Sequence, residues 1–323
     1  TPRFPFPLHG GDRVKSYHLL RMLSKHNEVV LVTFIQNANP TIEQINAVQS
    51  LGVELIYLPL NSIVSGLTAA FDSVINNIPL EIAYYNNDKF QKIVDLQLLN
   101  NKFDLAISFF LRTAEYLKDK NIPKILIAED CRTMYQERSS EYSNSFAQKL
   151  VRYWETQKLK TYEPETIVKF DYATLVTNED IDALRAIQPN GNYYLLTNVV
   201  DFNYFESQLN PEKRQNILFA GKLDVWANEM MAQRVFKNIF PLVKSKTSNV
   251  KLTIAGKNPS KKLRSLQSAS VNIVANPHSL KPLLQSHSIF VHPHGGASGI
   301  QNKVLEAMSC GCPVITTPTG IQG

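Results

Sequence analysis

The order of hydrophobic and polar residues predicts an α/β protein. Short apolar runs of strand length alternate with longer stretches whose apolar positions recur at helical spacing, and this alternation continues along the whole chain. Strands separated by helices are typical of parallel sheets with helices on both faces. We therefore expect doubly wound, Rossmann-like architecture. The predicted strands lie near residues 28–34, 53–58, 104–110, 124–130, 173–177, 193–197, 216–220, 251–255, 271–275, 288–292 and 313–317.

Two local patterns make the helix prediction more definite. Thr41 followed by Gln44 is typical of a capping box at a helix start. Residues from about 145 to 170 form one polar stretch with apolar residues at helical spacing, which predicts a single long helix. The basic residues of this stretch are Lys149, Arg152, Lys158 and Lys160. Two interpretations of them stay open: contact with an anionic membrane, or a plain solvated helix face.

The length of 323 residues predicts two domains, at roughly 150 residues per domain. A polar, charged segment at 203–215, which contains Asn210 and Pro211, is typical of a linker. We therefore expect an N-terminal domain at 1–202 and a C-terminal domain at 216–323. Rossmann-like domains bind ligands where loops leave the carboxyl ends of strands, so the site is expected in a cleft between the two domains.

Composition excludes several classes of protein. An apolar fraction of 44% and a charged fraction of 19% are globular values. No apolar run approaches the roughly 18 residues of a membrane-spanning helix. Three cysteines cannot form a disulfide framework, and no signal peptide opens the sequence. These features favour a cytoplasmic protein, either free or peripherally bound to a membrane.

The basic charge is concentrated in the C-terminal third. Residues 1–211 contain 20 Lys and Arg against 24 Asp and Glu, whereas residues 212–323 contain 14 against 4. A basic domain attracts anions such as nucleic acid, anionic lipid or a phosphorylated small molecule. Nucleic acid is disfavoured as a partner because no recognition motif is present. The glycine motifs of dinucleotide dehydrogenases and P-loop NTPases are also absent.

A first glycine-rich loop lies near the start of the chain. Gly10 and Gly11 precede Asp12 and Arg13 at the predicted start of an amphipathic helix. Two glycines let a ligand approach backbone N–H groups, and a helix N-terminus favours an anion. The pattern predicts a phosphate-binding loop, and a glycine-rich turn with Asp12 as the helix cap is the alternative.

A second glycine-rich loop follows the predicted strand at 288–292. Residues 293–299 include three glycines, and a helix that carries Lys303 is expected to begin near Ile300. The first amides of this helix would cradle an anion beside the Lys303 ammonium group. Glu306, one turn after Asn302, would lie on the same helix face and accept hydrogen bonds from a ribose diol.

The segment 299–315 resembles the donor-site signature of GT-B glycosyltransferases of family 4. The run around Gln301, Asn302 and Lys303 also resembles sugar transferases of bacterial polysaccharide gene clusters. The resemblance extends over nearly the whole chain. Its further matches are residues 10–11, 198–201, 219–223 and 254–257.

The resemblance implies a retaining hexosyltransferase of polysaccharide or cell-envelope biosynthesis. It would move a sugar from a nucleotide-diphosphate sugar to a glycan or lipid-linked acceptor, with the nucleotide-sugar as co-substrate and without a metal or another cofactor. By position, Lys222 would neutralise the diphosphate and Glu306 would bind the donor ribose, and these two are the expected catalytic residues. The other expected donor-binding residues are Gly10, Gly11, Arg13, Gly256, Lys257, Pro277, His278, Ser298, Gly299, Ile300, Gln301, Asn302 and Lys303.

The sequence departs from the family pattern at two site positions. Ser298 stands where the family has a first Glu that touches the transferred sugar, and Asn228 stands where a second phosphate-binding Lys is usual. Lys303 is expected to compensate for that lysine. The first strand and the closing C-terminal helices of the fold are also expected to be absent. Two alternatives stay open: a nucleotide-sugar 2-epimerase of the same fold, and a non-catalytic nucleotide-sugar binding module.

Other polar residues have structural interpretations that compete with functional ones. His292 and His294 lack partners at metal-ligand spacing and are expected to be structural. Cys310 and Cys312 are separated by one residue, which suits packing in a tight turn better than zinc or redox chemistry. A polar cluster at the end of the predicted strand 124–130 consists of Glu129, Asp130 and Arg132. Acceptor binding and helix capping explain this cluster equally well.

Overall fold

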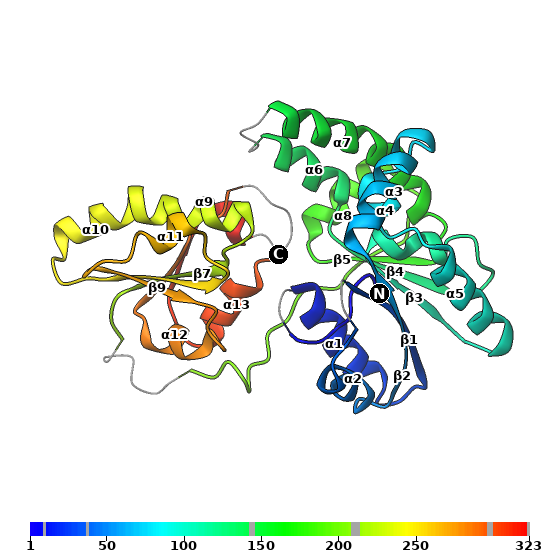
Figure 1. Ribbon diagram of the computed structural model, residues 1–323, viewed down its shortest axis with the longest axis horizontal. Helices are drawn as coiled ribbons and strands as arrows, with labels where there is room; N and C mark the ends of the chain where they lie inside the picture. Colours follow the sequence, from blue (N-terminus) through cyan, green and yellow to red (C-terminus); the bar gives the residue numbers. More distant parts are fainter. Residues whose placement is uncertain (9–10, 37–38, 142–145, 208–213, 296–299, 322–323) are drawn as a thin grey trace. The chain divides into compact units, whose positions relative to one another are not determined.

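The computed structural model describes residues 1–8, 11–36, 39–141, 146–207, 214–295 and 300–321 (Figure 1). The predicted α/β class is confirmed, because every described strand pair is parallel and helices connect the strands. The chain divides into two compact units, Thr1–Thr197 and Asn198–Gly323. The predicted domain bounds at 202 and 216 stay predictions, and residues 208–213 of the predicted linker lie outside the described part of the chain.

The N-terminal unit contains a two-stranded and a four-stranded parallel sheet. The first pairs β1 (Val29–Gln36) with β2 (Val53–Leu60). The second has the order β3-β4-β5-β6, with β3 at Ala106–Phe109, β4 at Lys124–Glu129, β5 at Tyr172–Leu175 and β6 at Tyr193–Leu195. The helices are α1 (Gly11–Leu23), α2 (Ile42–Gln49), α3 (Ser62–Ile75), α4 (Leu80–Ala83), α5 (Asp88–Asn100), α6 (Arg132–Glu141), α7 (Phe146–Ile167) and α8 (Asn178–Ile187), with a 3-10 helix at Leu111–Tyr116.

Local signals and apolar burial explain these elements. The predicted capping box is present at the start of α2, where the Thr41 hydroxyl accepts from the Gln44 amide and the Gln44 side chain accepts from the Thr41 amide. The predicted long helix is α7. Stacked aromatic rings fill the core of the unit, where Phe34 lies 4.3 Å from Phe90 between ring centroids. Apolar residues of β1 and β4, such as Phe34 and Leu126, are buried in this core. Each of the two strands ends at a polar residue, Gln36 in β1 and Glu129 in β4.

The C-terminal unit is one five-stranded parallel sheet with the order β11-β10-β7-β8-β9. Its strands are β7 (Ile217–Lys222), β8 (Leu252–Lys257), β9 (Val271–Ala275), β10 (Ile289–His292) and β11 (Val314–Thr316). Its helices are α9 (Trp226–Arg234), α10 (Phe240–Lys246), α11 (Lys261–Arg264), α12 (Lys281–Ser286) and α13 (Asn302–Ser309), with a π-helical stretch at Val235–Ile239 and a 3-10 helix at Pro318–Ile321.

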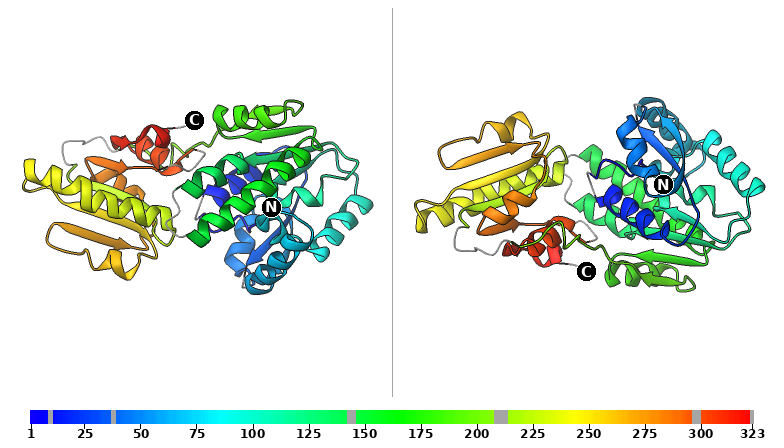
Figure 2. Two further views of the ribbon diagram at one scale, coloured as in Figure 1. Left: turned by 90° about the horizontal axis from the view of Figure 1, so that it is seen from above. Right: turned by 90° about the horizontal axis from the view of Figure 1, so that it is seen from below.

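Helices cover both faces of this sheet (Figures 1 and 2). On one face, Val235 and Phe240 pack with the β7 and β8 side chains. On the other face, Leu284 of α12 and Val304 and Ala307 of α13 pack against Leu218 and Phe290. This double covering is the doubly wound arrangement that the sequence predicts. Each of the eleven predicted strands is present, with bounds that differ by at most two residues.

Candidate functional site

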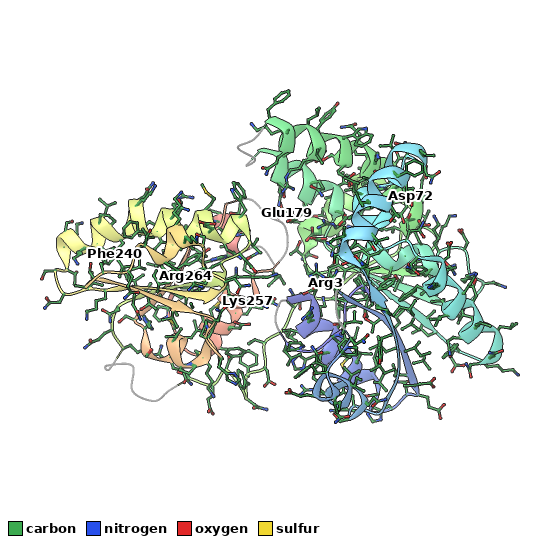
Figure 3. The ribbon with its side chains drawn as sticks, in the orientation of Figure 1. Arg3, Asp72, Glu179, Phe240, Lys257 and Arg264 are labelled. Atoms are coloured by element: carbon green, nitrogen blue, oxygen red, sulfur yellow. The ribbon has the colours of Figure 1, made fainter. Side chains whose placement is uncertain are left out.

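The strand order of the C-terminal unit creates a topological switch point between β7 and β10. The chain proceeds from β7 to β8 and β9 on one side and then returns to place β10 and β11 on the other. Ligands of doubly wound sheets bind outside the carboxyl ends of the strands at such a point. Helix α13 follows β10, so its N-terminus begins at this edge, next to the carboxyl ends of β7 at Lys222 and β8 at Lys257 (Figure 3 labels Lys257).

Two glycines allow β7 and β8 to approach closely at this edge. Gly256 has φ of 152°, and a Cβ atom there would lie 1.8 Å from the carbonyl oxygen of Gly221. No residue with a side chain fits this position without moving the backbone. The expected donor-binding residues Gly256 and Lys257 therefore lie at a narrow strand edge, where the Lys257 side chain is exposed. Pro277 and His278 follow β9 at the same edge of the sheet, and His278 is exposed.

Lys303 and Asn228 are joined directly at the start of α13. The Lys303 ammonium donates to Asn228 Oδ1 at 3.2 Å, and Asn228 Nδ2 donates to the carbonyl oxygen of Lys222 at 3.0 Å. Burial lowers the pKa of Lys303 to about 8, whereas Glu306 acts in the opposite direction. The ammonium of Lys303 thus lies beside Asn228, the position at which the resemblance leads us to expect a lysine. The exposed Lys222 side chain belongs to the same edge.

Helix α13 presents backbone donors and one carboxylate. The amides of Val304 and Leu305 donate to the carbonyl oxygen of Gln301, at 2.8 and 3.4 Å. The amides of Asn302 and Lys303 are therefore the ones that remain for a ligand. Within the described residues, Gln301 provides no side-chain cap. Asn302 Oδ1 accepts from Asn198 Nδ2 at 2.9 Å, so Asn302 can offer an anion its backbone amide and its side-chain Nδ2 group as donors. Glu306 is half-buried; burial raises its pKa, and Lys303 lowers it. Ile300 is half-buried just before Gln301.

Three expected site residues, Gly10, Ser298 and Gly299, lie outside the described residues. The loop half of the second predicted glycine motif therefore stays a prediction, and so does the role of Ser298. What the structure describes is the helical half of the motif, from Ile300 onward.

The two histidines at or just after the end of β10 and the two cysteines of this unit are packed side chains. The His292 ring is fully buried, and its centroid lies 6.0 Å from the Phe290 ring and 5.4 Å from the His294 ring. Burial, the Lys303 charge and His294 lower the pKa of His292 to about 3, so the ring is neutral at pH 7. Cys310 and Cys312 are buried in the core against α12 and α13. The described residues contain no group of three or more His, Cys, Asp or Glu side chains placed to hold a metal ion.

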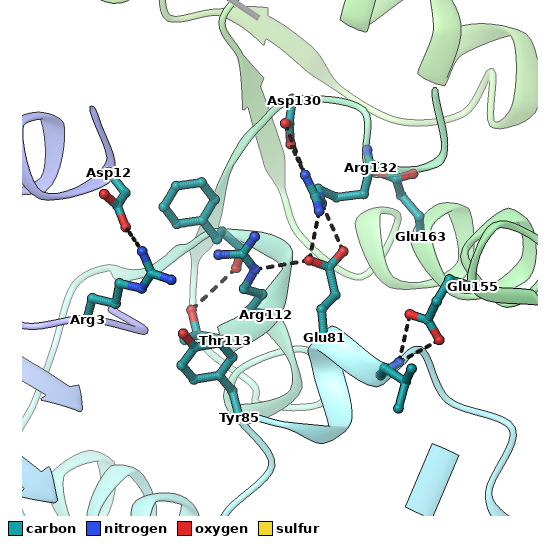
Figure 4. Close-up of polar contacts among 12 residues, drawn as sticks. Arg3, Asp12, Glu81, Tyr85, Arg112, Thr113, Asp130, Arg132, Glu155 and Glu163 are labelled. Atoms are coloured by element: carbon teal, nitrogen blue, oxygen red, sulfur yellow. Dashed lines mark hydrogen bonds and ion pairs between the residues drawn. The ribbon is translucent and has the colours of Figure 1, made fainter. Parts of the chain in front are cut away.

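The expected donor-binding residues of the N-terminal unit lie at the start of α1. Gly11 is the first residue of this helix, and Arg13 lines a cavity of about 120 Å³ together with Arg3 and Gln36 of β1. Arg3 donates to Asp12 Oδ2 at 2.9 Å (Figure 4). Burial lowers the pKa of Arg13, and Arg3 adds to this effect, whereas Asp12 opposes it. The cavity is therefore a small cationic pocket at the carboxyl end of β1.

The Lys15–Glu129 pair is a candidate functional feature that the sequence did not single out. Glu129 ends β4 with a φ of 75°, an uncommon value for a residue with a side chain. Its Oε1 atom lies 2.5 Å from Lys15 Nζ, and Lys15 also donates to the carbonyl oxygen of Leu196 at 2.9 Å. Burial raises the pKa of Glu129 to about 6, although Lys15 lowers it. A strained, buried carboxyl group at a strand end is typical of a ligand-binding edge.

Arg132 and its neighbours have a structural role. The Arg132 guanidinium is buried and donates to both carboxylate oxygens of Glu81, at 2.8 and 2.9 Å, and Glu81 also accepts from Arg112 at 3.1 Å (Figure 4). The Glu163 carboxylate accepts from the amides of Arg132 and Thr133, each at 2.8 Å, and thereby caps α6. Of the two interpretations that the sequence left open for Arg132, these contacts favour the structural one.

Comparison with known proteins relates the chain to glycosyltransferases. Residues 214–323 match the family model described as "Glycosyl transferases group 1". A relative in Klebsiella pneumoniae, described as an uncharacterized 44.6 kDa protein in the cps region, is 20% identical over 333 residues, which cover 99% of this chain and 82% of the relative.

Solved structures of similar shape cover nearly the whole chain. Sucrose-phosphate synthase from Thermosynechococcus elongatus has a TM-score of 0.68 at 11% identity, covering 99% of this chain and 82% of that one. The UDP-forming trehalose-phosphate synthase of Burkholderia xenovorans has a TM-score of 0.63 at 10% identity, covering 99% and 84%. HepE from Anabaena, solved with UDP and glucose, has a TM-score of 0.62 at 10% identity, covering 97% and 78%.

These comparisons confirm the resemblance that the sequence indicates. The fold is that of the GT-B glycosyltransferases, with Rossmann-like units, and residues 214–323 have the pattern of the group 1 glycosyl transferases. None of the helices in the described part of the chain is long and apolar enough to cross a membrane.

Proposed function

We propose that this GT-B chain is a retaining, metal-independent glycosyltransferase that transfers a hexose from a nucleotide-diphosphate sugar to a glycan or lipid-linked acceptor. One observation carries the proposal: the ammonium of Lys303 lies 3.2 Å from Asn228 Oδ1 at the N-terminus of α13, at the switch point of the C-terminal sheet. This arrangement concentrates positive charge and free backbone donors at one point.

Lys303 replaces the second phosphate-binding lysine of the family pattern. That lysine is expected at position 228, where this chain has Asn228. The Asn228 amide holds the Lys303 ammonium through Oδ1 and holds the end of β7 through Nδ2. In this proposal a lysine ammonium therefore lies beside position 228, although the lysine belongs to α13 and position 228 belongs to α9. In this proposal Lys222 and Lys303 together neutralise the diphosphate, and the α13 amides bind its oxygens.

The same groups would stabilise the transition state. When the glycosidic bond breaks, the leaving nucleoside diphosphate gains negative charge, and fixed donors and cations then bind it more strongly than they bind the intact donor. Such a reaction needs no nucleophile from the protein, and the leaving phosphate itself would accept the acceptor proton on the same face. Glu306, on the helix turn that follows Lys303, would bind the ribose hydroxyls as a hydrogen-bond acceptor.

The assignment of Gly10, Gly11 and Arg13 to the donor stays a prediction, as does the contact of Gly256, Lys257, Pro277 and His278 with the base. UDP is the nucleotide bound in the Anabaena HepE structure, which makes a UDP-sugar the first donor to test. The Klebsiella pneumoniae relative is named for its place in a cps region. This fits the resemblance to sugar transferases of polysaccharide gene clusters and supports a role in polysaccharide or cell-envelope biosynthesis. The location that we propose for this role is the cytoplasm.

Donor binding tests the proposal. A thermal-shift screen of UDP-, GDP- and ADP-sugars would identify the donor, because a ligand that binds only the folded state raises the midpoint. With that donor, we expect Lys303→Ala to raise the Kd at least tenfold, about 1.4 kcal/mol, by titration calorimetry. Lys251→Ala is the matched control, since Lys251 is an exposed lysine that precedes β8 at the opposite edge of the same sheet.

The outcomes separate the proposal from its alternatives. An unchanged donor Kd in Lys303→Ala would contradict the assigned site. Appearance of an epimer when donor is incubated without acceptor, followed by NMR, would indicate a 2-epimerase. Donor binding without turnover across a panel of glycan and lipid-linked acceptors would indicate a binding module.

A further inference from the structure

Helix α3 carries its large apolar side chains on the outside of the N-terminal unit. Its buried residues are the small Ala69 and Ser73, whereas Leu67 is 71% exposed and Phe71 is 66% exposed. At about 100° per residue, the exposed large apolar positions fall within one arc of about 120°. These positions are Ile63, Val64, Leu67, Phe71, Val74 and Ile75.

This arrangement is the reverse of an ordinary surface helix, which buries its apolar stripe. The remainder of α3 is made of Ser, Thr, Ala and Gly residues, and Asp72 is its single charged residue (labelled in Figure 3). No charge interrupts the apolar arc. A contiguous exposed patch of this kind marks a surface that contacts another apolar phase or molecule.

The first half of α7 also exposes large apolar side chains. Phe146, Leu150, Tyr153 and Trp154 are exposed there at helical spacing. Lys158 joins the two helices: its ammonium donates to the hydroxyl and the carbonyl oxygen of Ser73 on α3, and it lies 3.7 Å from the centroid of the Trp154 ring. Helices α3 and α7 are neighbours in the fold (Figure 1). The two helices are therefore in direct contact within the N-terminal unit.

The charges at the edge of this surface are cationic. Lys149 has no acidic partner within the described residues, and Arg152 bonds to the neutral Gln136 at 3.1 Å. Some other cations of this unit do pair with acids, as Lys118 does with Glu115 and Lys169 with Asp119. The segment of α7 from Phe146 to Trp154 contains both cations and no acid. An anionic surface would complement it.

The sequence left membrane contact and a plain solvated face open for four basic residues of α7, and two of these four are engaged elsewhere. Lys158 is buried against Ser73, and Lys160 pairs with Glu137 at 2.8 Å. The basic residues of α7 alone would therefore be a weak lipid anchor. The apolar arc of α3, which the sequence analysis did not single out, is the larger feature.

We propose that the exposed faces of α3 and of the first half of α7 form a docking surface for an anionic lipid bilayer. The apolar arc of α3 would enter the boundary between head groups and acyl chains, with the helix parallel to the membrane plane. Tyr153 and Trp154 suit the head-group level because their rings are apolar with a polar tip. Lys149 and Arg152 contact anionic head groups. This inference rests on the proposed function at one point: docking would bring the enzyme to a lipid-linked acceptor.

Vesicle flotation of the full chain tests the surface. We expect the protein to bind vesicles of phosphatidylcholine with phosphatidylglycerol, and Leu67→Gln/Phe71→Gln to weaken this binding roughly tenfold or more. Leu99→Gln/Leu242→Gln is the matched control, because these two leucines are 80% and 69% exposed outside the surface. Lys149→Gln/Arg152→Gln should lower the preference for these vesicles over pure phosphatidylcholine.

Folding and donor binding are measured on the same variants. All substituted leucine and phenylalanine side chains are exposed, so circular dichroism spectra and thermal midpoints should match those of the wild type. Donor Kd should also stay unchanged, which separates this proposal from the donor-site proposal. Equal vesicle binding by wild type and Leu67→Gln/Phe71→Gln would overturn the inference. So would a wild-type dimer that dissociates in this variant while neither protein binds vesicles, since the surface would then bind a second copy.

Discussion

The two units of the protein use their charged residues in opposite ways. Within the described residues, every ion pair lies in the N-terminal unit except Lys281–Glu206. Residues 1–197 contain 20 Lys and Arg against 22 Asp and Glu, so most charges there can find a partner. Residues 198–323 contain 14 against 6, which leaves cations in excess. Ten of the 20 Lys and Arg residues of the first unit form ion pairs, whereas Lys281 alone does so in the described part of the second unit.

The Glu81 cluster is the clearest case of internal pairing (Figure 4). Glu81 on α4 receives Arg112 and Arg132, and Arg132 also pairs with Asp130 at 3.2 Å. The two arginines outweigh burial and hold the pKa of Glu81 at about 2, well below its usual value. These groups are committed to the fold and offer no free charge.

Lys303 shows the opposite case. The Lys303 amine is shielded from water, and among the described residues no carboxylate accepts a hydrogen bond from it. Burial lowers its pKa to about 8. Because the unfolded chain binds this proton more tightly, the charged Lys303 destabilises the folded state below pH 8. That cost disappears as the pH rises from about 8 to the unfolded value of 10.5. A diphosphate would compensate for the lost hydration, which is a physical reason to keep such a lysine at a donor site.

Removing the Glu81 charge should have the largest effect. We expect Glu81→Gln to lower the free energy of unfolding by about 3 kcal/mol, because the buried Arg132 guanidinium and the partly buried Arg112 guanidinium are left close together without a counter-charge. Urea unfolding followed by Trp154 fluorescence measures this, in a Trp226→Phe background so that the signal comes from the N-terminal unit. Glu54→Gln, an exposed substitution in the same unit, is the control.

The pH dependence of this variant gives a second check. The Glu81 contribution is fully present above its unfolded pKa of about 4.5 and is lost as the pH falls through about 2. The stability difference between wild type and Glu81→Gln should therefore shrink between these two values. A difference that stays constant down to pH 2 would show that Glu81 acts through its shape rather than its charge.

Sequence patterns predicted most of the fold. All eleven strands were predicted because buried parallel strands are short apolar runs, and the α2 start was predicted because Thr41 and Gln44 form a local capping box. The helical half of the expected donor motif is also predictable, because it depends only on residues that are close together in the sequence. The resemblance at 299–315 predicted the placement of Lys303 and Glu306 on one helix, and α13 carries both.

What the sequence missed depends on contacts between distant residues. The Lys303–Asn228 bond joins positions 75 residues apart, and Lys15–Glu129 joins α1 to the end of β4. The positive φ of Glu129 is also invisible in a pattern of apolar positions. The α3 arc was missed for another reason: apolar residues at helical spacing normally predict a buried face. Only the burial of Ala69 and Ser73 shows that the helix is turned outward.

Donor affinity should depend on pH through Lys303. The free protein loses the Lys303 proton as the pH rises through about 8, so donor binding above this value must take up a proton. We expect the affinity to fall by up to about tenfold per pH unit above that point. Lys303→Arg keeps its charge in this range and should show a flatter profile by titration calorimetry. Parallel profiles for the two proteins would contradict the role of the Lys303 charge.

Lys222 should contribute the smallest effect, and its salt dependence distinguishes it from Lys303. Its side chain is exposed at the end of β7, so its attraction for a diphosphate is weakened by water and by salt. We expect Lys222→Gln to raise the donor Kd only about threefold at low ionic strength, about 0.6 kcal/mol. At high salt this difference should vanish, whereas the larger effect of Lys303→Ala should persist because ions do not reach a half-buried ammonium as easily. If Lys222→Gln were the more damaging of the two at every salt concentration, the exposed lysine would be the main phosphate ligand. The excess of cations in the C-terminal unit would then act at its surface rather than at the start of α13.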